Sequence, residues 1–366
     1  MGIRHSGGVT VSPPLHRWRN ELMKKYLKAA AVFTATSLLL ASGCSTRNST
    51  GGSTAATSGT TSGKTITVVF VPKLQGSAFF EAMDAGGKKA MADIPGLKWT
   101  MEGPVDADPT QQADIVRKYI QQKVDVLVVA PDDPDSMAPI LKEARDAGIH
   151  VATADTDAPN SVREVMVNQA TAQGIGESIA TTLAEAMGGK GKVATVSCGE
   201  TAANLNSWVV VQNAVFKEKY PNIDMFKTVY AGEDQAKAVT MATDIINSTP
   251  DLKGLIGECT TSAPGVAQAV KSAGKVGQIF TVGVGTPKAM LPYLTDGSSS
   301  GSILWDVESL GYLAAWAAVQ LANGTQYQAT QDVGSIKGVA YDSANKTLIL
   351  GKPHVFTKDD AGKYNY

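Results

Sequence analysis

From Thr65 onward, short apolar runs rich in β-branched residues alternate with longer amphipathic stretches, and this alternation constrains the fold more than any other feature of the sequence. Alternating strands and helices of these lengths predict βαβ units and parallel sheets. The runs are apolar throughout rather than at every second position, as is typical of parallel strands covered on both faces. The sequence therefore predicts an α/β fold.

The alternation comes in two successive series of about five units each, which predicts two doubly wound lobes. In the first series we expect strands at 66–71, 99–103, 126–130, 150–154 and 164–167 and helices at 78–92, 110–121 and 136–147. In the second we expect helices at 172–187, 207–220, 235–247 and 264–273 and strands at 192–197, 225–230, 254–258 and 278–282. A single eight-stranded barrel is the competing architecture, but it would need evenly spaced units with no pause midway.

A late strand at 302–305 and a helix at 306–323 follow the second series, where we expect the chain to return to the first lobe. The first lobe should then comprise residues 65–167 and 306–336, and the second lobe residues 168–305 and 337–366. Repeated connections between the lobes would form a multi-strand hinge, and closure around a ligand is the natural motion of such a pair.

Residues 1–44 have the features of an export signal. A short apolar stretch, 29–41, ends in small residues and Cys44, and the basic residues before it are Lys24, Lys25 and Lys28. The stretch is shorter than the roughly 20 residues that a spanning helix needs, and its parts are those of a secretory signal. It looks like a bacterial lipoprotein signal in which Cys44 is lipidated.

Two details of this signal leave alternatives. Ala41 stands where lipoprotein signals most often carry leucine, so cleavage by an ordinary signal peptidase is the alternative to lipidation. Residues 1–22 form no part of a signal, so we expect Met23 to be the true start. Residues 45–64 are nearly all Ser, Thr, Gly and Asn, a composition typical of a flexible tether. The body is therefore expected outside the cytoplasm, anchored to the cell membrane at the cell surface or in the periplasm.

Composition excludes several classes of function. Hydrophobic residues make up 43% of the chain and charged residues 18%, as in a well-packed globular protein, and the net charge of −1 gives no basic field for nucleic acid. The few histidines and cysteines have no zinc-site spacing, and no nucleophile elbow, phosphate-binding loop or dinucleotide fingerprint occurs. We therefore expect a monomeric binding protein with no metal and no cofactor, rather than an enzyme.

Ligands of open parallel sheets bind beyond the carboxyl ends of the strands, so the residues that follow each strand are the candidate site. In the first lobe these are Lys73, Phe79, Phe80, Asp155 and Asp157. Aromatic rings can pack against the C–H faces of a sugar, and a carboxylate can accept two hydrogen bonds from neighbouring hydroxyls. The alternatives are core packing for the two aromatic residues and a solvated turn for the two aspartates.

The second lobe offers amide, aromatic and small polar side chains at the corresponding places. They are Asn204, Asn206, Trp208, Cys259, Thr260, Trp305 and Asp306. One of Asn204 and Asn206 is expected to cap the helix that follows, and Asp135 to cap the helix 136–147. For Trp305 the alternative is a place in the core.

Cys198 and Cys259 end the first and third strands of the second lobe. In the strand order 2-1-3-4-5 these strands are neighbours, about 4.8 Å apart, which lies within disulfide range. We expect a disulfide at the floor of the second-lobe cleft, with two buried free thiols as the alternative.

Several segments in a consistent order resemble one family. They are 71–74 with Gly76 and 79–80, 154–157, 167–169, 282–283 with 286–287, Met290 with 292–293, 304–307, and 356–358 with 363–364. Together they resemble the sugar-binding members of the type I periplasmic-binding-protein superfamily, and within it the autoinducer-2- and rhamnose-binding branch. These proteins are soluble receptors of ABC importers. The resemblance adds Asn168 and Gln169 to the candidate site.

The resemblance also implies roles for particular residues. Lys73 and Asp155 match positions that contact autoinducer-2, whereas the family's Asp-Gln pair falls on Asn204 and Leu205, and its Pro-x-Ala segment falls on 258–260. Because the second-lobe half of that site is changed, we expect a monosaccharide such as a deoxysugar or pentose, delivered to an ABC permease. The alternatives are an autoinducer-2-type receptor or sensor subunit and, less favoured, an enzyme with Lys73 or Asp155 as its acid–base group.

Overall fold

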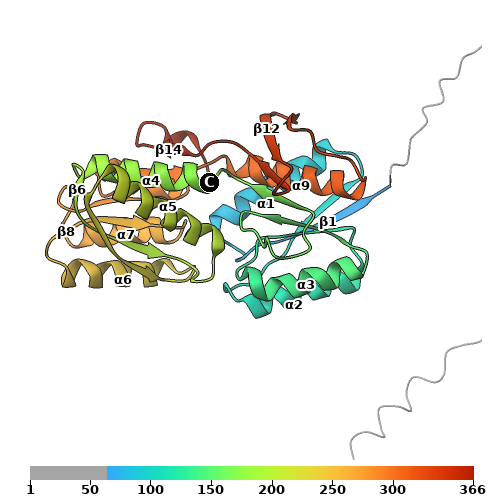
Figure 1. Ribbon diagram of the computed structural model, residues 1–366, viewed down its shortest axis with the longest axis horizontal. Helices are drawn as coiled ribbons and strands as arrows, with labels where there is room; N and C mark the ends of the chain where they lie inside the picture. The colour runs from blue at the N-terminus through green and yellow to red at the C-terminus, as the bar shows by residue number, and fades with distance from the viewer. Residues whose placement is uncertain (1–63) are drawn as a thin grey trace, which may run out of the picture. The chain divides into compact units, whose positions relative to one another are not determined.

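Residues 64–366 are described by the computed structural model, and they form two α/β lobes (Figure 1). The signal region, Cys44 and nearly all of the linker lie outside the described residues. Within residues 64–366, no helix has the length and apolar character that crossing a membrane requires.

The first sheet has eight strands in the order β11-β12-β13-β5-β4-β3-β1-β2. They are β1 (Ile66–Val71), β2 (Leu97–Met101), β3 (Val126–Val129), β4 (His150–Ala154), β5 (Val165–Asn168), β11 (Thr330–Val333), β12 (Ile336–Asp342) and β13 (Thr347–Ile349). Strands β1 to β5 are parallel in the order 2-1-3-4-5, and β13 extends them by pairing parallel to β5. Strands β11 and β12 continue the sheet in antiparallel pairing.

Two pairs of helices cover this sheet on opposite faces (Figure 1). They are α1 (Ala78–Asp93) with α9 (Val307–Ala322), and α2 (Pro109–Gln122) with α3 (Pro134–Asp146). Helices α1 and α9 pack so closely that a Cβ atom on Gly311 would overlap the backbone oxygen of Met83. Strands β1, β3, β4 and β5 are therefore buried on both faces, which explains their largely apolar sequences, whereas buried and exposed residues alternate in the edge strand β2.

The second sheet has six strands in the order β14-β10-β9-β8-β6-β7. They are β6 (Lys190–Ser197), β7 (Asn222–Tyr230), β8 (Leu252–Gly257), β9 (Phe280–Val284), β10 (Gly301–Leu304) and β14 (His354–Phe356). The helices are α4 (Ala172–Ala186), α5 (Ala203–Lys219), α6 (Gln235–Ser248), α7 (Ser262–Ser272) and α8 (Pro287–Asp296), and the short 3-10 helix η1 (Ala361–Lys363) follows β14. Strands β6 to β10 repeat the order 2-1-3-4-5 of the first lobe, and β14 pairs antiparallel with β10.

The chain passes between the lobes at three places, after β5, after β10 and after β13. The prediction of an α/β fold with two doubly wound lobes joined by a multi-strand hinge is confirmed. From here on, the first lobe means residues 64–168 and 307–349, and the second lobe residues 172–305 and 354–366.

The expected boundary after residue 336 is wrong, because β12 and β13 belong to the first sheet. Leu348 of β13 lies opposite Val167 of β5, so residues 337–349 extend the first lobe and the chain returns to the second lobe only after Ile349. Strands β11 to β14 were not expected from the sequence, since three of them have only three or four residues and the longer β12 is interrupted by Lys337 and Gly338.

Two helix starts also differ from expectation. Helix α3 is capped by Asp133, which accepts a hydrogen bond from the Ser136 amide, rather than by Asp135. Helix α5 begins at Ala203 after Ala202, without a side-chain cap, so neither Asn204 nor Asn206 caps it. Both asparagines lie inside the first turn, which leaves their side chains free for other partners.

Candidate functional site

A pocket lies between the lobes, beyond the carboxyl ends of both sets of parallel strands. The first lobe lines it with Lys73, Ser77, Phe79, Phe80 and Asp155. The second lobe lines it with Asn204, Leu205, Trp208, Glu233, Cys259, Thr260, Val284 and Trp305. The expectation that ligands bind beyond the carboxyl ends of the strands, here called the strand-end rule, thus brings together residues that are far apart in the sequence.

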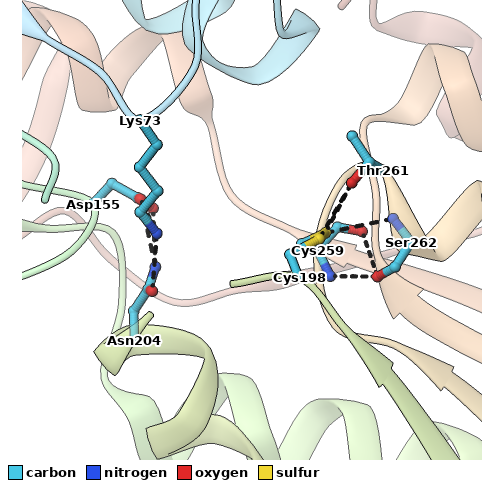
Figure 2. The surroundings of a disulfide bond; sticks show 7 residues. All are labelled: Lys73, Asp155, Cys198, Asn204, Cys259, Thr261 and Ser262. Atoms are coloured by element: carbon cyan, nitrogen blue, oxygen red, sulfur yellow. Dashed lines mark hydrogen bonds and ion pairs between the residues drawn. A yellow bond between two sulfur atoms is a disulfide. The ribbon is translucent and has the colours of Figure 1, made fainter. Parts of the chain in front are cut away.

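The polar side of the pocket is a contact between the lobes. Lys73 and Asp155 are 4% and 6% exposed, and Lys73 Nζ lies 3.6 Å from Asp155 Oδ2. Lys73 Nζ also donates to Asn204 Oδ1 at 3.2 Å, and Asn204 Nδ2 donates to both Asp155 oxygens at 3.4 Å (Figure 2). The amide of the second lobe therefore contacts both charges of the first.

Local backbone geometry aims Asp155 into the pocket. Asp155 follows the last residue of β4 with a φ of 62°, in the left-handed region that aspartate tolerates better than most residues. The Thr156 amide donates to the Ala154 oxygen at 2.7 Å across this tight turn. Burial raises the pKa of Asp155, and the ammonium group of Lys73 opposes that rise.

Aromatic rings form the opposite wall. The ring centroids of Phe79 and Trp305 are 5.8 Å apart, and those of Trp208 and Trp305 are 5.9 Å apart, both in edge-to-face arrangements. Among the described residues, Trp305 Nε1 is buried and has no hydrogen-bond partner. An apolar wall that carries a free indole donor, opposite a charged wall, suits a small ligand with both C–H faces and hydroxyl groups.

Glu233 is a pocket residue that the sequence analysis missed. It lies in the loop between β7 and α6, is half-buried, and lines the pocket near Cys259 and Thr260. Burial raises the pKa of its carboxyl group, and Lys73 opposes that rise. The strand-end rule would have found Glu233, because it follows β7 by three residues.

Five of the predicted residues do not line the pocket, and three of these have local partners instead. Asp157 forms two hydrogen bonds of 2.7 Å with the guanidinium of Arg163. Asn206 Nδ2 donates to the Glu200 oxygen at 2.8 Å. Asp306 is exposed and caps α9 by accepting from the Ser309 amide at 2.9 Å.

The other two, Asn168 and Gln169, lie where β5 leaves the first sheet. Asn168 is the last residue of β5, and its backbone oxygen accepts from the Leu350 amide at 2.8 Å. Gln169 is buried beside the pocket, and its Nε2 donates to Asp155 Oδ1 at 3.4 Å. Gln169 therefore supports Asp155 rather than facing the cavity.

Cys198 and Cys259 are joined by a disulfide, with their Cα atoms 6.1 Å apart (Figure 2). They follow the neighbouring strands β6 and β8. Their sulfurs and a Glu233 carboxylate oxygen lie within 4.8 Å of one another. Only a thiolate serves as a cysteine metal ligand, so the oxidised pair does not make this group a metal site.

A second buried polar group lies in the second lobe beside the pocket residues. Gln212 Nε2 donates to Glu258 Oε1 at 2.7 Å, and both side chains are fully buried. Glu258 Oε2 and Gln212 Oε1 find no partner among the described residues. Burial raises the pKa of Glu258 to about 8, so the side chain is mainly a neutral acid at neutral pH.

Comparisons with known proteins agree with this architecture. Residues 68–326 match the family model of the periplasmic binding protein domain. The ribose import binding protein of Bacillus subtilis is 26% identical over 311 residues, which cover 83% of this chain and 96% of that protein.

Two solved structures are similar over 82% of this chain. LsrB from Clostridium saccharobutylicum in complex with AI-2 has a TM-score of 0.76 and 27% identity, and all of that chain is covered. An ABC transporter solute binding protein from Clostridium phytofermentas with bound L-rhamnose has a TM-score of 0.76 and 26% identity, with 98% of that chain covered.

We predict that Glu258→Gln changes the pH dependence of stability. The folded-state pKa of about 8 lies above the ordinary value of 4.5. The neutral acid therefore makes its full contribution to the free energy of unfolding below pH 4.5, and this contribution is lost as the pH rises to 8. Glutamine keeps the acceptor for Gln212 and never ionises. The variant should therefore gain about 2–4 kcal/mol of unfolding free energy relative to wild type between about pH 5 and 8.

Urea unfolding of both proteins at the two pH values measures this gain. Glu218→Gln, an exposed change on the same helix as Gln212, is the matched control and should track wild type at both. An equal difference between Glu258→Gln and wild type at the two pH values would contradict the prediction.

Proposed function

The chain belongs to the periplasmic binding protein family, and we propose that it is an extracytoplasmic solute-binding lipoprotein that captures a small sugar and delivers it to an ABC importer. The relatives are named as binding proteins of sugar importers, which supports a receptor rather than an enzyme. One observation carries the proposal: a pocket between the lobes that joins a buried Lys73–Asp155 pair to an aromatic wall.

The lining of the pocket favours a small ligand that carries both hydroxyl groups and C–H faces. Carboxylate, ammonium and amide groups on one side can pair with hydroxyl groups, while Phe79 and Trp305 can pack against C–H faces. A monosaccharide meets both requirements.

Closure of the lobes around the sugar is the change that the importer would recognise. Asn204 already contacts Lys73 and Asp155 across the pocket, and Thr201 Oγ1 donates to the Asp132 oxygen of the other lobe at 3.1 Å. A sugar that bonds to groups on both lobes binds the closed form better than the open form, and so shifts the population toward closure. The permease would then recognise the closed arrangement.

We propose a pentose or deoxysugar as the ligand. The relatives include a ribose import binding protein and a protein with bound L-rhamnose, a deoxysugar. Leu205 gives the second-lobe side an apolar surface that can receive a methyl group. The alternative, an autoinducer-2-type receptor, is supported by the similarity to LsrB in complex with AI-2 and by Lys73 and Asp155.

Lipidation of Cys44 would hold this receptor at the membrane. The sequence of residues 24–44 supports the proposal, with its basic flank, short apolar stretch and cysteine. We predict that protein extracted from the membrane of an expressing bacterium begins at Cys44 and carries lipid on it. Intact mass spectrometry tests this, and an unlipidated N-terminus upstream of Cys44 would contradict it.

We predict that a pentose or deoxysugar raises the thermal unfolding midpoint, because a ligand that binds only the folded form stabilises it by mass action. A screen of D-ribose, D-arabinose, L-rhamnose, D-fucose, D-glucose and autoinducer-2 measures this. At a ligand concentration of about 100 times Kd, the free energy of unfolding rises by about 2.7 kcal/mol, which shifts the midpoint measurably. A shift with autoinducer-2 alone would favour the alternative, and no shift with any compound would contradict the receptor.

We predict that Glu233→Gln weakens binding of the sugar identified by this screen. A carboxylate that accepts hydrogen bonds from the sugar contributes about 1.5–3 kcal/mol, so Kd should rise roughly 10- to 100-fold, while the unfolding midpoint of the free protein changes little. Titration calorimetry measures Kd. Glu200→Gln, an exposed carboxylate on the same lobe that does not line the pocket, is the control. Equal affinities of all three proteins would exclude Glu233 from the site.

A further inference from the structure

The disulfide lies in the wall of the pocket itself. Cys259 lines the cavity and is 6% exposed, whereas its partner Cys198 is fully buried. The sulfurs therefore meet the cavity on one side and the second-lobe core on the other. Figure 2 shows the pair on the second lobe, with Thr261 and Ser262 beside it.

The disulfide ties together two separate loops that supply the second-lobe lining. The loop after Cys198 leads directly into the start of α5, which carries Asn204, Leu205 and Trp208. The loop after β8 contains Cys259 itself and Thr260. The covalent bond thus sets the spacing between the α5 side and the β8 side of the pocket.

Both loops also carry hydrogen bonds, which are weaker than the covalent bond between them. Cys259 is held by its amide, which donates to Ser262 Oγ at 3.0 Å, and Thr261 Oγ1 lies 3.1 Å from its sulfur. Helix α5, in contrast, starts at Ala203 with no side-chain cap. The loop before α5 is held by Thr201 Oγ1, which donates to the Asp132 oxygen at 3.1 Å, and by Asn206 Nδ2, which donates to the Glu200 oxygen at 2.8 Å. Neither of these bonds joins it to the loop after β8, so the disulfide is the covalent restraint on the distance between Asn204 and Thr260.

We propose that the Cys198–Cys259 disulfide positions the second-lobe half of the binding site, so that its reduction weakens sugar binding while both lobes stay folded. The proposal rests on the proposed function of the same pocket. The disulfide would make the affinity for sugar depend on the redox state of the surroundings. It would act through the placement of Asn204 and Thr260 rather than through direct loss of a ligand contact.

The reaction is ordinary thiol–disulfide exchange with a dithiol reductant. A thiolate of dithiothreitol attacks one sulfur, the Cys198–Cys259 bond breaks, and a mixed disulfide forms. The second thiol of the reductant then closes a cyclic disulfide and releases the protein. Two electrons and two protons reach the protein, which ends with two thiols. A bound sugar that covers Cys259 should slow this reaction, because it blocks the access of the reductant to the sulfur.

The experiment compares oxidised, reduced and reoxidised full-length protein. D-ribose, L-rhamnose and D-fucose are titrated into each form, and alkylation with peptide mapping reports the state of Cys198 and Cys259. We expect Kd to rise at least about tenfold on reduction, to recover on reoxidation, and to be raised similarly by Cys198→Ala combined with Cys259→Ala. The sugar that binds should also slow reduction by dithiothreitol.

A control separates positioning from general loss of stability. Val339→Ala removes a fully buried side chain from the first sheet, outside the pocket, so it should lower the unfolding midpoint without raising Kd. Hydrogen exchange gives a readout that needs no ligand: amides of residues 199–205 and 259–262 should exchange faster in the reduced protein than in the oxidised protein.

Each outcome decides the question. Equal Kd and equal exchange in the oxidised and alkylated reduced forms would overturn the proposal, as would two alkylated thiols before any reductant is added. If none of the sugars binds the oxidised protein, the receptor assignment fails for them, and the exchange of residues 199–205 still tests whether the disulfide holds the α5 loop.

Discussion

The contact of Lys73 with Asp155 and Asn204 is the interaction on which the rest of the molecule depends. A buried ion pair is weak support for stability, because desolvation offsets most of its attraction. Here the pair sits at the boundary between two lobes, and one amide from the opposite lobe bonds to both charges. In the function proposed above, ligand hydroxyl groups would replace the two 3.4 Å hydrogen bonds from Asn204 to Asp155 with shorter ones.

The strand order and the connections between the lobes place this contact. Both sheets use the strand order 2-1-3-4-5, and the carboxyl ends of both sets of strands meet at the pocket. Three connections join the lobes, so the two halves can close while each keeps its own covered sheet. The second lobe adds the Cys198–Cys259 disulfide and the buried hydrogen bond between Gln212 and Glu258 beside the lining residues.

Much of the fold could be predicted from the sequence, because apolar parallel strands and amphipathic helices carry their pattern locally. The predicted 66–71 and 150–154 strands coincide with β1 and β4. Strands β12 and β13 could not be placed, since their position depends on pairing between distant segments: β13 pairs with β5, and β12 pairs with β13. In the site, Lys73 and Asp155 followed from strand ends. Asp157 and Asp306 did not end in the pocket, because Arg163 and the start of α9 hold them, and residue spacing cannot reveal such partners.

The central claim is that one sugar is held jointly by both lobes. A crystal structure of the protein with the sugar that stabilises it most tests this directly. The account predicts sugar density that contacts Lys73 and Asp155 on one side and Asn204, Trp208 and Trp305 on the other, with the lobes closed. Sugar density that contacts a single lobe, or that lacks contact with either Lys73 or Trp305, would contradict the claim.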